Sequence, residues 1–345
     1  MPDGIKNKIN QELFKLGQNL GREYHFQQIS PLLSKVIKGY ILRPGKRTRP
    51  ILLVIGYLGF AKSIRPGIYR CALSAELLHD FMLIHDDIID KSDTRRGLPS
   101  MHCLLNNYLR KFKNLKFNGQ DLAIVVGDIL YAMAIDAFLA IKEEPQRKEK
   151  ALKKFIEAAS FTGSGEFIEL IYGAKDIRQI KKTDIYKIYN YKTAFYTFAC
   201  PLSIGAILGG ANEKQIRLIT RFGLTLGTAF QIKDDILGIF SEAKLTGKSQ
   251  LADLQEAKKT ILIWHAYNHG STAQKKVIRI IMSKEKIIRA DLIKMRRIIE
   301  DTGALKFAKH EINSLLKQAQ NLINSSNIQP RYKKFLDNYS RQILS

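Results

Sequence analysis

The amino-acid sequence predicts an all-α fold, a single large helical bundle that spans residues 1–345. Apolar residues recur with a helical period along most of the chain, whereas strand-like alternation bounded by turn residues is scarce. Hydrophobic residues make up 45% of the sequence, which is enough for a sizeable core. The nine prolines and 23 glycines are too few for a linker-rich chain. Only about the first eight residues are expected to be disordered.

Turn-forming residues divide the predicted bundle into successive helices. Breaks are expected at Pro44-Gly45, at Gly97, near 163–165, at Gly209-Gly210 and around Gly247. Helices are expected over roughly residues 9–40, 50–62, 67–92, 101–115, 120–142, 147–172, 183–209, 213–240 and 252–269, with several more toward the C-terminus. No interval has the composition of a flexible linker, so one domain of about ten or more helices is predicted.

Residues 122–141 are almost wholly apolar over the length of a membrane span. Asp128 and Asp136 interrupt the run, and a carboxylate at mid-bilayer depth is costly. A buried helix of a large bundle needs the same apolar character. We therefore interpret this segment as a core helix and expect no transmembrane segment.

Composition indicates the compartment and the class of partner. Cys71, Cys103 and Cys200 lie far apart without a CxxC spacing, and the N-terminal segment lacks the features of a signal peptide. A reduced, cytoplasmic location is therefore expected. Lys and Arg number 56 against 32 acids, a net charge of +24 that favours anionic partners such as phosphorylated small molecules or membrane headgroups. No nucleic-acid-binding motif accompanies the charge, so nucleic acid is not expected, whereas peripheral membrane contact stays open.

The segment from His79 to Asp90 carries the first group of carboxylates. On a helix, Asp86 and Asp90 lie four residues apart on one face, and His79 joins the same stripe two turns earlier. Stacked like charges destabilise a helix unless a cation neutralises them. The surrounding residues are apolar, so the helix is expected to be packed, and packed carboxylates indicate Mg²⁺. The alternative is an acidic helix end near the surface.

A second group, Gln231, Asp234 and Asp235, lies inside the apolar segment 222–240. Gln231 and Asp234 are three residues apart and therefore share one helical face. Two acidic groups in two buried helices are hard to explain as protein surface. They are explained if the helices face each other across a central active-site cavity that holds several metal ions.

Basic residues accompany the acidic groups. Arg95 and Arg96 follow the first acidic helix directly, and Lys192-Thr193 lies in another helix. The remaining basic sequences are Gly45-Lys46-Arg47-Thr48-Arg49, Lys248 in a predicted loop, and Lys258-Lys259-Thr260. Metal-binding acids together with many Lys and Arg groups predict a site for more than one diphosphate.

These motifs, taken in order, resemble those of the trans-isoprenyl diphosphate synthase (polyprenyl synthetase) family, most of all its short-chain geranylgeranyl diphosphate synthases. GKRTRP is similar to the family's GKRxRP, and DDIIDKSDTRRGLP matches DDxxDxxxxRRGxP. FQIKDDILG resembles FQxxDDxLD, and TGKSQLADLQEAKKT resembles TGKxxxxDLxEGKxT. The similarity runs over nearly the whole chain and implies the helical isoprenoid synthase fold. It also implies Mg²⁺, with three ions per site, and a prenyltransferase that uses isopentenyl and allylic diphosphates.

The resemblance implies a role for each matched position. Isopentenyl diphosphate would be bound by Lys46, Arg49, His79 and Arg96, with Arg47 also among the substrate-binding residues. The allylic diphosphate would be surrounded by Arg95, Lys192, Thr193, Gln231, Lys248 and Lys258. Asp86 and Asp90 would bind two metal ions and Asp234 a third, supported by Asp87, Asp235 and Asp253. The catalytic residues would be Asp86, Asp87, Asp90, Arg95, Lys192, Asp234 and Lys248.

Three positions depart from the family pattern. Gly238 stands where many members have a third Asp, and Ala257 replaces a usual Gly. Glu166 and Glu169 replace the Gln and Asp of the family's GQxxD. The last change alters a segment that would contribute to the allylic site.

The reaction implied is ionisation of the allylic diphosphate, attack by the double bond of isopentenyl diphosphate, and loss of a proton. Phe81 lies five residues before Asp86, roughly 7.5 Å along a helix, and with Met82 would form the floor under the growing tail. An aromatic residue there, with no insertion inside DDxxD, resembles the geranylgeranyl-forming type. A twenty-carbon product is expected, with farnesyl or longer chains as alternatives.

Other functions explain the sequence less completely. A terpene cyclase has no need of the residues for isopentenyl diphosphate, and a regulatory homologue would be expected to lose acids that the first motif keeps. A basic RNA- or membrane-binding protein leaves the acidic groups unexplained. His265 and His269 have Ala266 instead of the Glu of HExxH, so surface histidines are expected rather than zinc ligands. The family is usually homodimeric, and the apolar segment 122–141 favours a dimer here.

Overall fold

The computed structural model of the protein describes residues 2–241 and 251–344. Within these residues the regular structure is helical except for two short strands, β1 (Thr94–Arg95) and β2 (Leu98–Pro99), which pair antiparallel. The prediction of an all-α fold is therefore confirmed. By its internal contacts the chain forms unit 1 (Met1–Leu152 with Ile204–Ala211) and unit 2 (Lys153–Ser203 with Asn212–Ser345). The single domain over residues 1–345 stays a prediction.

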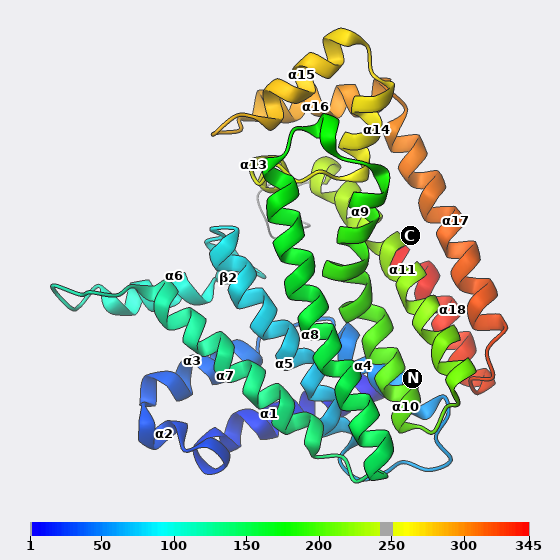
Figure 1. Ribbon diagram of the computed structural model, residues 1–345. Helices are drawn as coiled ribbons and strands as arrows, with labels where there is room; N and C mark the ends of the chain where they lie inside the picture. The colour runs from blue at the N-terminus through cyan, green and yellow to red at the C-terminus, as the bar shows by residue number, and fades with distance from the viewer. Residues whose placement is uncertain (1, 242–250, 345) are drawn as a thin grey trace. The chain divides into compact units, whose positions relative to one another are not determined.

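Unit 1 is built around α5 (Ile68–Ile89), which packs against α1, α4 and α7 (Figure 1). Residues 71–78 of α5 are buried on every side, as expected of a helix that is apolar all round. Burial becomes one-sided toward its C-terminal end, where the first acidic motif lies. The other helices of unit 1 are α1 (Pro2–Tyr24), α2 (Phe26–Ile29), α3 (Pro31–Ile41), α4 (Thr48–Leu58), α6 (Met101–Leu109) and α7 (Gly119–Leu139), and α8 (Pro145–Ala174) begins in it.

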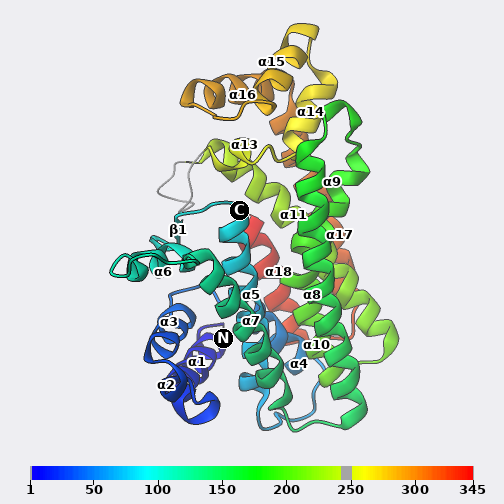
Figure 2. The same ribbon diagram turned by 60° about the vertical axis from the view of Figure 1, so that its left-hand side comes forward.

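The prediction of one continuous helix over residues 9–40 is wrong. Three helices, α1, α2 and α3, take its place and pack against one another (Figure 2). The first break is at His25, whose backbone is left-handed with φ 57°. The second is at Ser30, which is extended because Pro31 follows it, and Ser30 Oγ accepts a hydrogen bond from Leu33 N at 3.3 Å. The helix predicted over 101–115 also ends early, at Leu109.

The apolar segment predicted as a core helix is α7, which packs against α5 and α6. It begins with a capping box in which Asn118 Oδ1 accepts a hydrogen bond from Gln120 N at 2.6 Å, and Asp121 Oδ2 one from Asn118 N at 2.8 Å. Its length and composition are also those of a membrane span, and 44% of its most apolar window is buried within the structure. The prediction of a core helix therefore holds only for the face of α7 that packs against α5 and α6. On the other face, Ile124 and Val125 are 41% and 54% exposed.

Unit 2 is organised by α11 (Glu213–Phe240), which packs against α17 (Ala304–Asn324) and the π-helix η2 (Tyr189–Ala199). A Cβ on Gly227 would lie 2.5 Å from Ala194 Cα, so this glycine permits the close approach of α11 and η2. The other elements are η1 (Ile177–Gln179), α9 (Lys182–Ile188), α10 (Cys200–Leu208), α13 (Ala252–Gln255), α14 (Ile261–His269), α15 (Thr272–Met282), α16 (Arg289–Asp301) and α18 (Pro330–Leu344).

Three predictions in this part of the chain need correction. The segment 252–269 is not one helix, because residues 256–260 separate α13 from α14. The segment 183–209 is not one α-helix, because η2 inserts π-helical turns between α9 and α10. The break expected near 163–165 does not occur, because α8 runs without interruption from Pro145 to Ala174. A Cβ on Gly165 would lie 2.5 Å from Lys192 N, so the glycine permits close packing of α8 on η2 rather than ending the helix.

Candidate active site

The first acidic motif lies at the C-terminal end of α5 in unit 1. Asp90 is the C-cap, and its backbone N–H donates to Asp86 O at 2.8 Å. The Asp87 side chain is fully buried, and Arg95 Nε donates to Asp87 Oδ1 at 2.8 Å, with a second contact from Arg95 Nη2. The Asp86 carboxylate is half-exposed and makes no hydrogen bond or ion pair with the described residues. The motif thus separates a carboxylate that is used inside the protein from one that is available to a ligand.

Arg95 reaches Asp87 because the chain turns back after α5 through the β1–β2 hairpin. The turn residues Arg96 and Gly97 have positive φ values of 56° and 74°. Burial lowers the pKa of Arg95, but the hydrogen bond to Asp87 and its charge outweigh that effect, so the pKa of Arg95 is raised. Arg95 is therefore a permanent positive charge at neutral pH.

Arg96 lies beside the basic turn that precedes α4. Its Nη1 donates to Pro44 O at 3.4 Å. Burial lowers the pKa of His79 well below its usual range, and the positive charges of Arg49, Arg96 and other arginines lower it further. The structure of unit 1 therefore brings together His79, Arg49 and Arg96 from three separate sequence motifs, with Lys46 exposed on the same turn.

Arg47 lies differently from the other basic residues of this turn. Its side chain is 4% exposed, and Nη1 forms an ion pair with Glu76 Oε1 at 2.6 Å. Nη2 donates to Arg43 O at 2.7 Å, and Nε donates to Asn10 Oδ1 at 3.1 Å. All three nitrogens are thus used inside unit 1, so we assign Arg47 to the support of the turn rather than to substrate. Removing one partner of such a buried pair typically costs about 3–5 kcal/mol.

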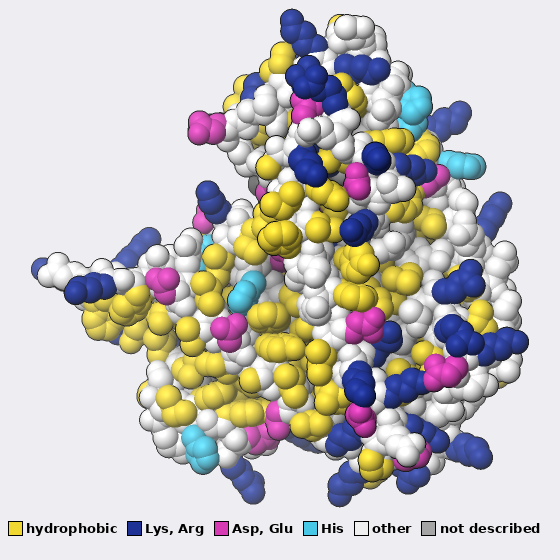
Figure 3. Space-filling model, viewed as in Figure 1, with side chains coloured by type: hydrophobic (Ala, Val, Ile, Leu, Met, Phe, Trp, Pro, Cys, Tyr) yellow, Lys and Arg dark blue, Asp and Glu magenta, His cyan; other side chains and the backbone are white. Residues whose placement is uncertain are grey.

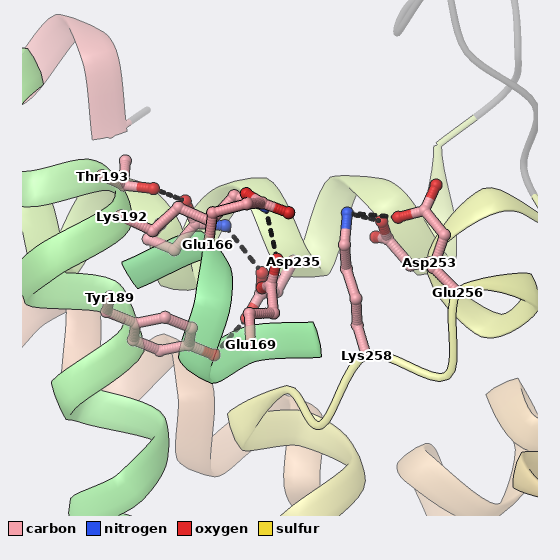
Figure 4. A network of polar contacts seen from close by, with 10 residues as sticks. Glu166, Glu169, Tyr189, Lys192, Thr193, Asp235, Asp253, Glu256 and Lys258 are labelled. Atoms are coloured by element: carbon pink, nitrogen blue, oxygen red, sulfur yellow. Dashed lines mark hydrogen bonds and ion pairs between the residues drawn. The ribbon is translucent and has the colours of Figure 1, made fainter. Parts of the chain in front are cut away.

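The second acidic motif lies on α11 in unit 2 and belongs to a chain of hydrogen bonds (Figure 4). Thr193 Oγ1 donates to Gln231 Oε1 at 2.6 Å, and Gln231 Nε2 donates to Asp235 Oδ1 at 2.9 Å. Tyr189 Oη donates to Asp235 and accepts from Ile261 N at 2.9 Å. Burial raises the pKa of Asp235 well above its usual range. Asp235 is thus a structural acid, whereas Asp234, next to it, is exposed.

Lys192 and Lys258, the two predicted diphosphate-binding lysines of unit 2 that the structure describes, each lie between two carboxylates (Figure 4). Lys192 Nζ is 2.5 Å from Glu166 Oε2 and also contacts Glu169. Lys258 Nζ is 2.6 Å from Glu256 Oε2 and 3.5 Å from Asp253 Oδ1. The two glutamates that depart from the family pattern are therefore the partners of Lys192. Lys248 lies outside the described residues.

The two other departures have local physical consequences. A Cβ on Gly238 would lie 2.0 Å from Asp253 Oδ2, so the Asp253 carboxylate fills the space that a side chain at 238 would need. Ala257, where the family usually has Gly, has a left-handed backbone with φ 52°. That conformation is strained for alanine and not for glycine, which explains the usual residue.

Sequence reasoning missed Tyr189, Glu256 and Glu76, each of which is paired with a predicted site residue or its neighbour. Glu256 lies two residues before Lys258 within a recognised motif, and this spacing could have indicated that the two side chains are paired. Tyr189 lies in a π-helix, whose altered period hides which residues share a face. Glu76 lies ten residues before Asp86 and had no sequence signal of its own.

Comparison with known proteins places the chain in a family. The polyprenyl synthetase family matches residues 30–299. A geranylgeranyl diphosphate synthase of Sulfolobus acidocaldarius is 31% identical over 315 residues, which cover 84% of this chain and 90% of that protein. A geranylfarnesyl diphosphate synthase of Aeropyrum pernix is 30% identical over 305 residues, which cover 87% and 89%.

A crystal structure of geranylgeranyl pyrophosphate synthase from Corynebacterium glutamicum, complexed with isoprenyl diphosphate and magnesium, has the same fold. Its TM-score is 0.87 at 24% identity, over 100% of this chain and 98% of that one. The chain therefore belongs to the polyprenyl synthetase family. It is an enzyme of the trans-prenyltransferase class, most similar to geranylgeranyl diphosphate synthases, as its motifs predicted.

The strain at Ala257 gives a stability prediction. Ala257→Gly should raise the free energy of unfolding by up to about 1 kcal/mol, because relief of the left-handed strain exceeds the entropy that glycine adds to the unfolded chain. Ala290→Gly, at an exposed helical position in α16, is the control and should lower it by about 0.5 kcal/mol. Urea unfolding measures both. A loss of stability in Ala257→Gly would contradict the assigned strain.

Proposed function

We propose that this chain condenses isopentenyl diphosphate with an allylic diphosphate, head to tail, and that its main product has twenty carbons. The observation that carries the proposal is the arrangement at the end of α5. Arg95 holds Asp87, which leaves the Asp86 carboxylate without a protein partner among the described residues. The names of the most similar relatives, including a geranylgeranyl diphosphate synthase, support the choice of reaction.

The carboxylates of Asp86, Asp90 and Asp234 fit Mg²⁺, which prefers hard oxygen donors. Asp86 and Asp90 are half-exposed at the end of a packed helix, and Asp234 is exposed on α11. We assign two ions to Asp86 and Asp90 and a third to Asp234. Bound there, Mg²⁺ neutralises the charge that develops on the departing diphosphate.

The basic residues bind and orient the two substrates. We assign isopentenyl diphosphate to Lys46, Arg49, His79 and Arg96, all of unit 1. His79 is uncharged near neutral pH because its pKa is lowered, so it contributes a hydrogen bond rather than a charge. We assign the allylic diphosphate to Arg95, Lys192, Thr193, Gln231, Lys248 and Lys258. The hydrogen-bond chain from Thr193 through Gln231 to Asp235 fixes two of these side chains before substrate binds.

Product analysis tests the proposal. Pure protein is incubated with Mg²⁺, isopentenyl diphosphate and, in separate reactions, dimethylallyl, geranyl or farnesyl diphosphate. Chromatography should show mainly a twenty-carbon diphosphate from each starter. A cyclised terpene made without isopentenyl diphosphate, or no product from any starter, would overturn the assigned reaction, and chains of thirty carbons or more would overturn the assigned length.

Asp86→Asn removes the charge of a proposed metal ligand while keeping its size. Turnover should fall by several orders of magnitude, since charge stabilisation by the metal supplies several kcal/mol and about 1.4 kcal/mol is tenfold in rate. Asp301→Asn on α16 removes the same charge from an exposed, weakly paired position and should leave turnover unchanged. An Asp86→Asn variant with wild-type helicity and near-normal turnover would refute the metal role.

Phe81 is the proposed limit on product length. Its ring packs 5.3 Å from the Tyr131 ring on α7 and 4.6 Å from the His85 ring, by centroids. Phe81→Ala should remove this barrier and lengthen the product beyond twenty carbons, whereas Phe14→Ala, at a position 55% exposed on α1, should not. If the products of Phe81→Ala match those of the wild type, Phe81 only packs α5 on α7 and the floor lies elsewhere; Met82 would be examined next.

The protein is proposed to be a cytoplasmic homodimer. The outward residues of α7 include the exposed apolar side chains Ile124, Val125 and Leu139, which a second copy would cover, beside the exposed Asp128 and Asp136. Cys71, Cys103 and Cys200 are free thiols, in agreement with a reducing compartment. Light scattering at micromolar concentration should give the mass of a dimer, and Val125→Asp should lower it toward that of the monomer. A monomeric wild type would contradict this assignment.

A further inference from the structure

The end of α6 and the loop that follows it expose large apolar side chains to solvent. Every residue from 110 to 118 is exposed. The exposed fractions are 36% for Tyr108, 48% for Phe112, 39% for Leu115 and 46% for Phe117. We call residues 108–117 the α6 arm. In Figure 3 hydrophobic side chains follow this arm, with Lys and Arg beside them.

The α6 arm is also strongly basic. Its four cations are Arg110, Lys111, Lys113 and Lys116. The sequence holds no acid between residues 94 and 120, and in the described part of the chain none of the four cations is ion-paired. The arm therefore combines an unneutralised positive charge with apolar surface.

Cation and aromatic groups are arranged together in this arm. Lys111 Nζ lies 3.9 Å from the Tyr108 ring centroid and 5.1 Å from that of Phe112, and the two centroids are 5.9 Å apart. Such a cluster places an ammonium group and two ring faces at the same surface. Side chains of this kind favour the headgroup level of a bilayer, where one end of the group is apolar and the other is wet.

We propose that the α6 arm docks the enzyme on an anionic membrane surface, with its apolar side chains among the headgroups and its four cations near the lipid phosphates. Basic segments with exposed Phe and Leu bind such interfaces by burying apolar side chains and by electrostatic attraction to anionic lipids. A second copy of this chain fits the arm less well, because the arm holds four cations and no acid and because lysine is depleted at protein interfaces. The arm would hold the enzyme where its twenty-carbon diphosphate product can enter the bilayer, a benefit that rests on the proposed function.

Vesicle co-sedimentation of the full-length protein tests the proposal without reference to activity. Binding should be found with vesicles of phosphatidylcholine plus phosphatidylglycerol, and should be lost with phosphatidylcholine alone. Binding should also be lost at about 1 M salt, because the Debye length is then about 3 Å and the charges are screened. Lys111→Gln with Lys113→Gln should weaken binding about thirtyfold. Phe112→Ser with Phe117→Ser should weaken it at unchanged charge.

The matched control is Lys306→Gln with Lys309→Gln, which removes the same charge from exposed positions of α17. It should bind vesicles like the wild type. Equal losses in the two lysine double variants would show attraction by overall charge and overturn the proposal, as would absence of binding to anionic vesicles. If the Phe112, Phe117 variant instead binds vesicles normally but has a smaller mass in light scattering, the arm is an interface between copies and the proposal is wrong.

Discussion

Buried carboxylates need a nearby cation or hydrogen-bond donor, and the predicted site depends on how this protein meets that need. Asp87 is paired with Arg95, and Glu76 with Arg47. Asp235 accepts hydrogen bonds from Tyr189 and Gln231 instead. In each unit the adjacent acid, Asp86 or Asp234, remains toward solvent. The inner acids fix the local structure, whereas the outer acids reach the surface, where we propose that they bind metal.

The same constraint governs the lysines of unit 2. Lys192 and Lys258 each contact two carboxylates. A diphosphate that approached these lysines would meet the paired carboxylates as well, and like charges repel. Divalent cations change this balance because they neutralise carboxylates and attract phosphate oxygens together. Binding of substrate and of metal is therefore expected to be strongly coupled. The glutamates at 166 and 169 should strengthen this coupling relative to the usual Gln and Asp.

Local sequence patterns predicted most of the fold because the helices are long and their apolar periods are clear. They failed where the outcome depended on tertiary contact. The pair Gly163 and Gly165 suggested a break, but Gly165 is needed for the approach of α8 to η2. The π-helical turns of η2 have no recognisable sequence signal, and the contact from Tyr189, where η2 begins, to Asp235 joins residues 46 positions apart in the sequence. Arg47 sits among substrate-type residues in its motif, and only its burial beside Glu76 distinguishes it.

The central claim is that a diphosphate binds to Lys192 and Lys258 of unit 2 only together with a divalent cation. Titration calorimetry of inorganic diphosphate, with Mg²⁺ present and with Mg²⁺ removed by a chelator, tests it most directly, after correction for the heat of Mg²⁺–diphosphate mixing. The titration with Mg²⁺ should show one more bound diphosphate per chain than the titration without it, because the basic residues assigned to isopentenyl diphosphate in unit 1 need no metal. Equal numbers of bound diphosphate in both titrations would contradict the coupling, because Lys192 and Lys258 would then hold the anion against the neighbouring carboxylates without a metal ion, or would not bind it at all.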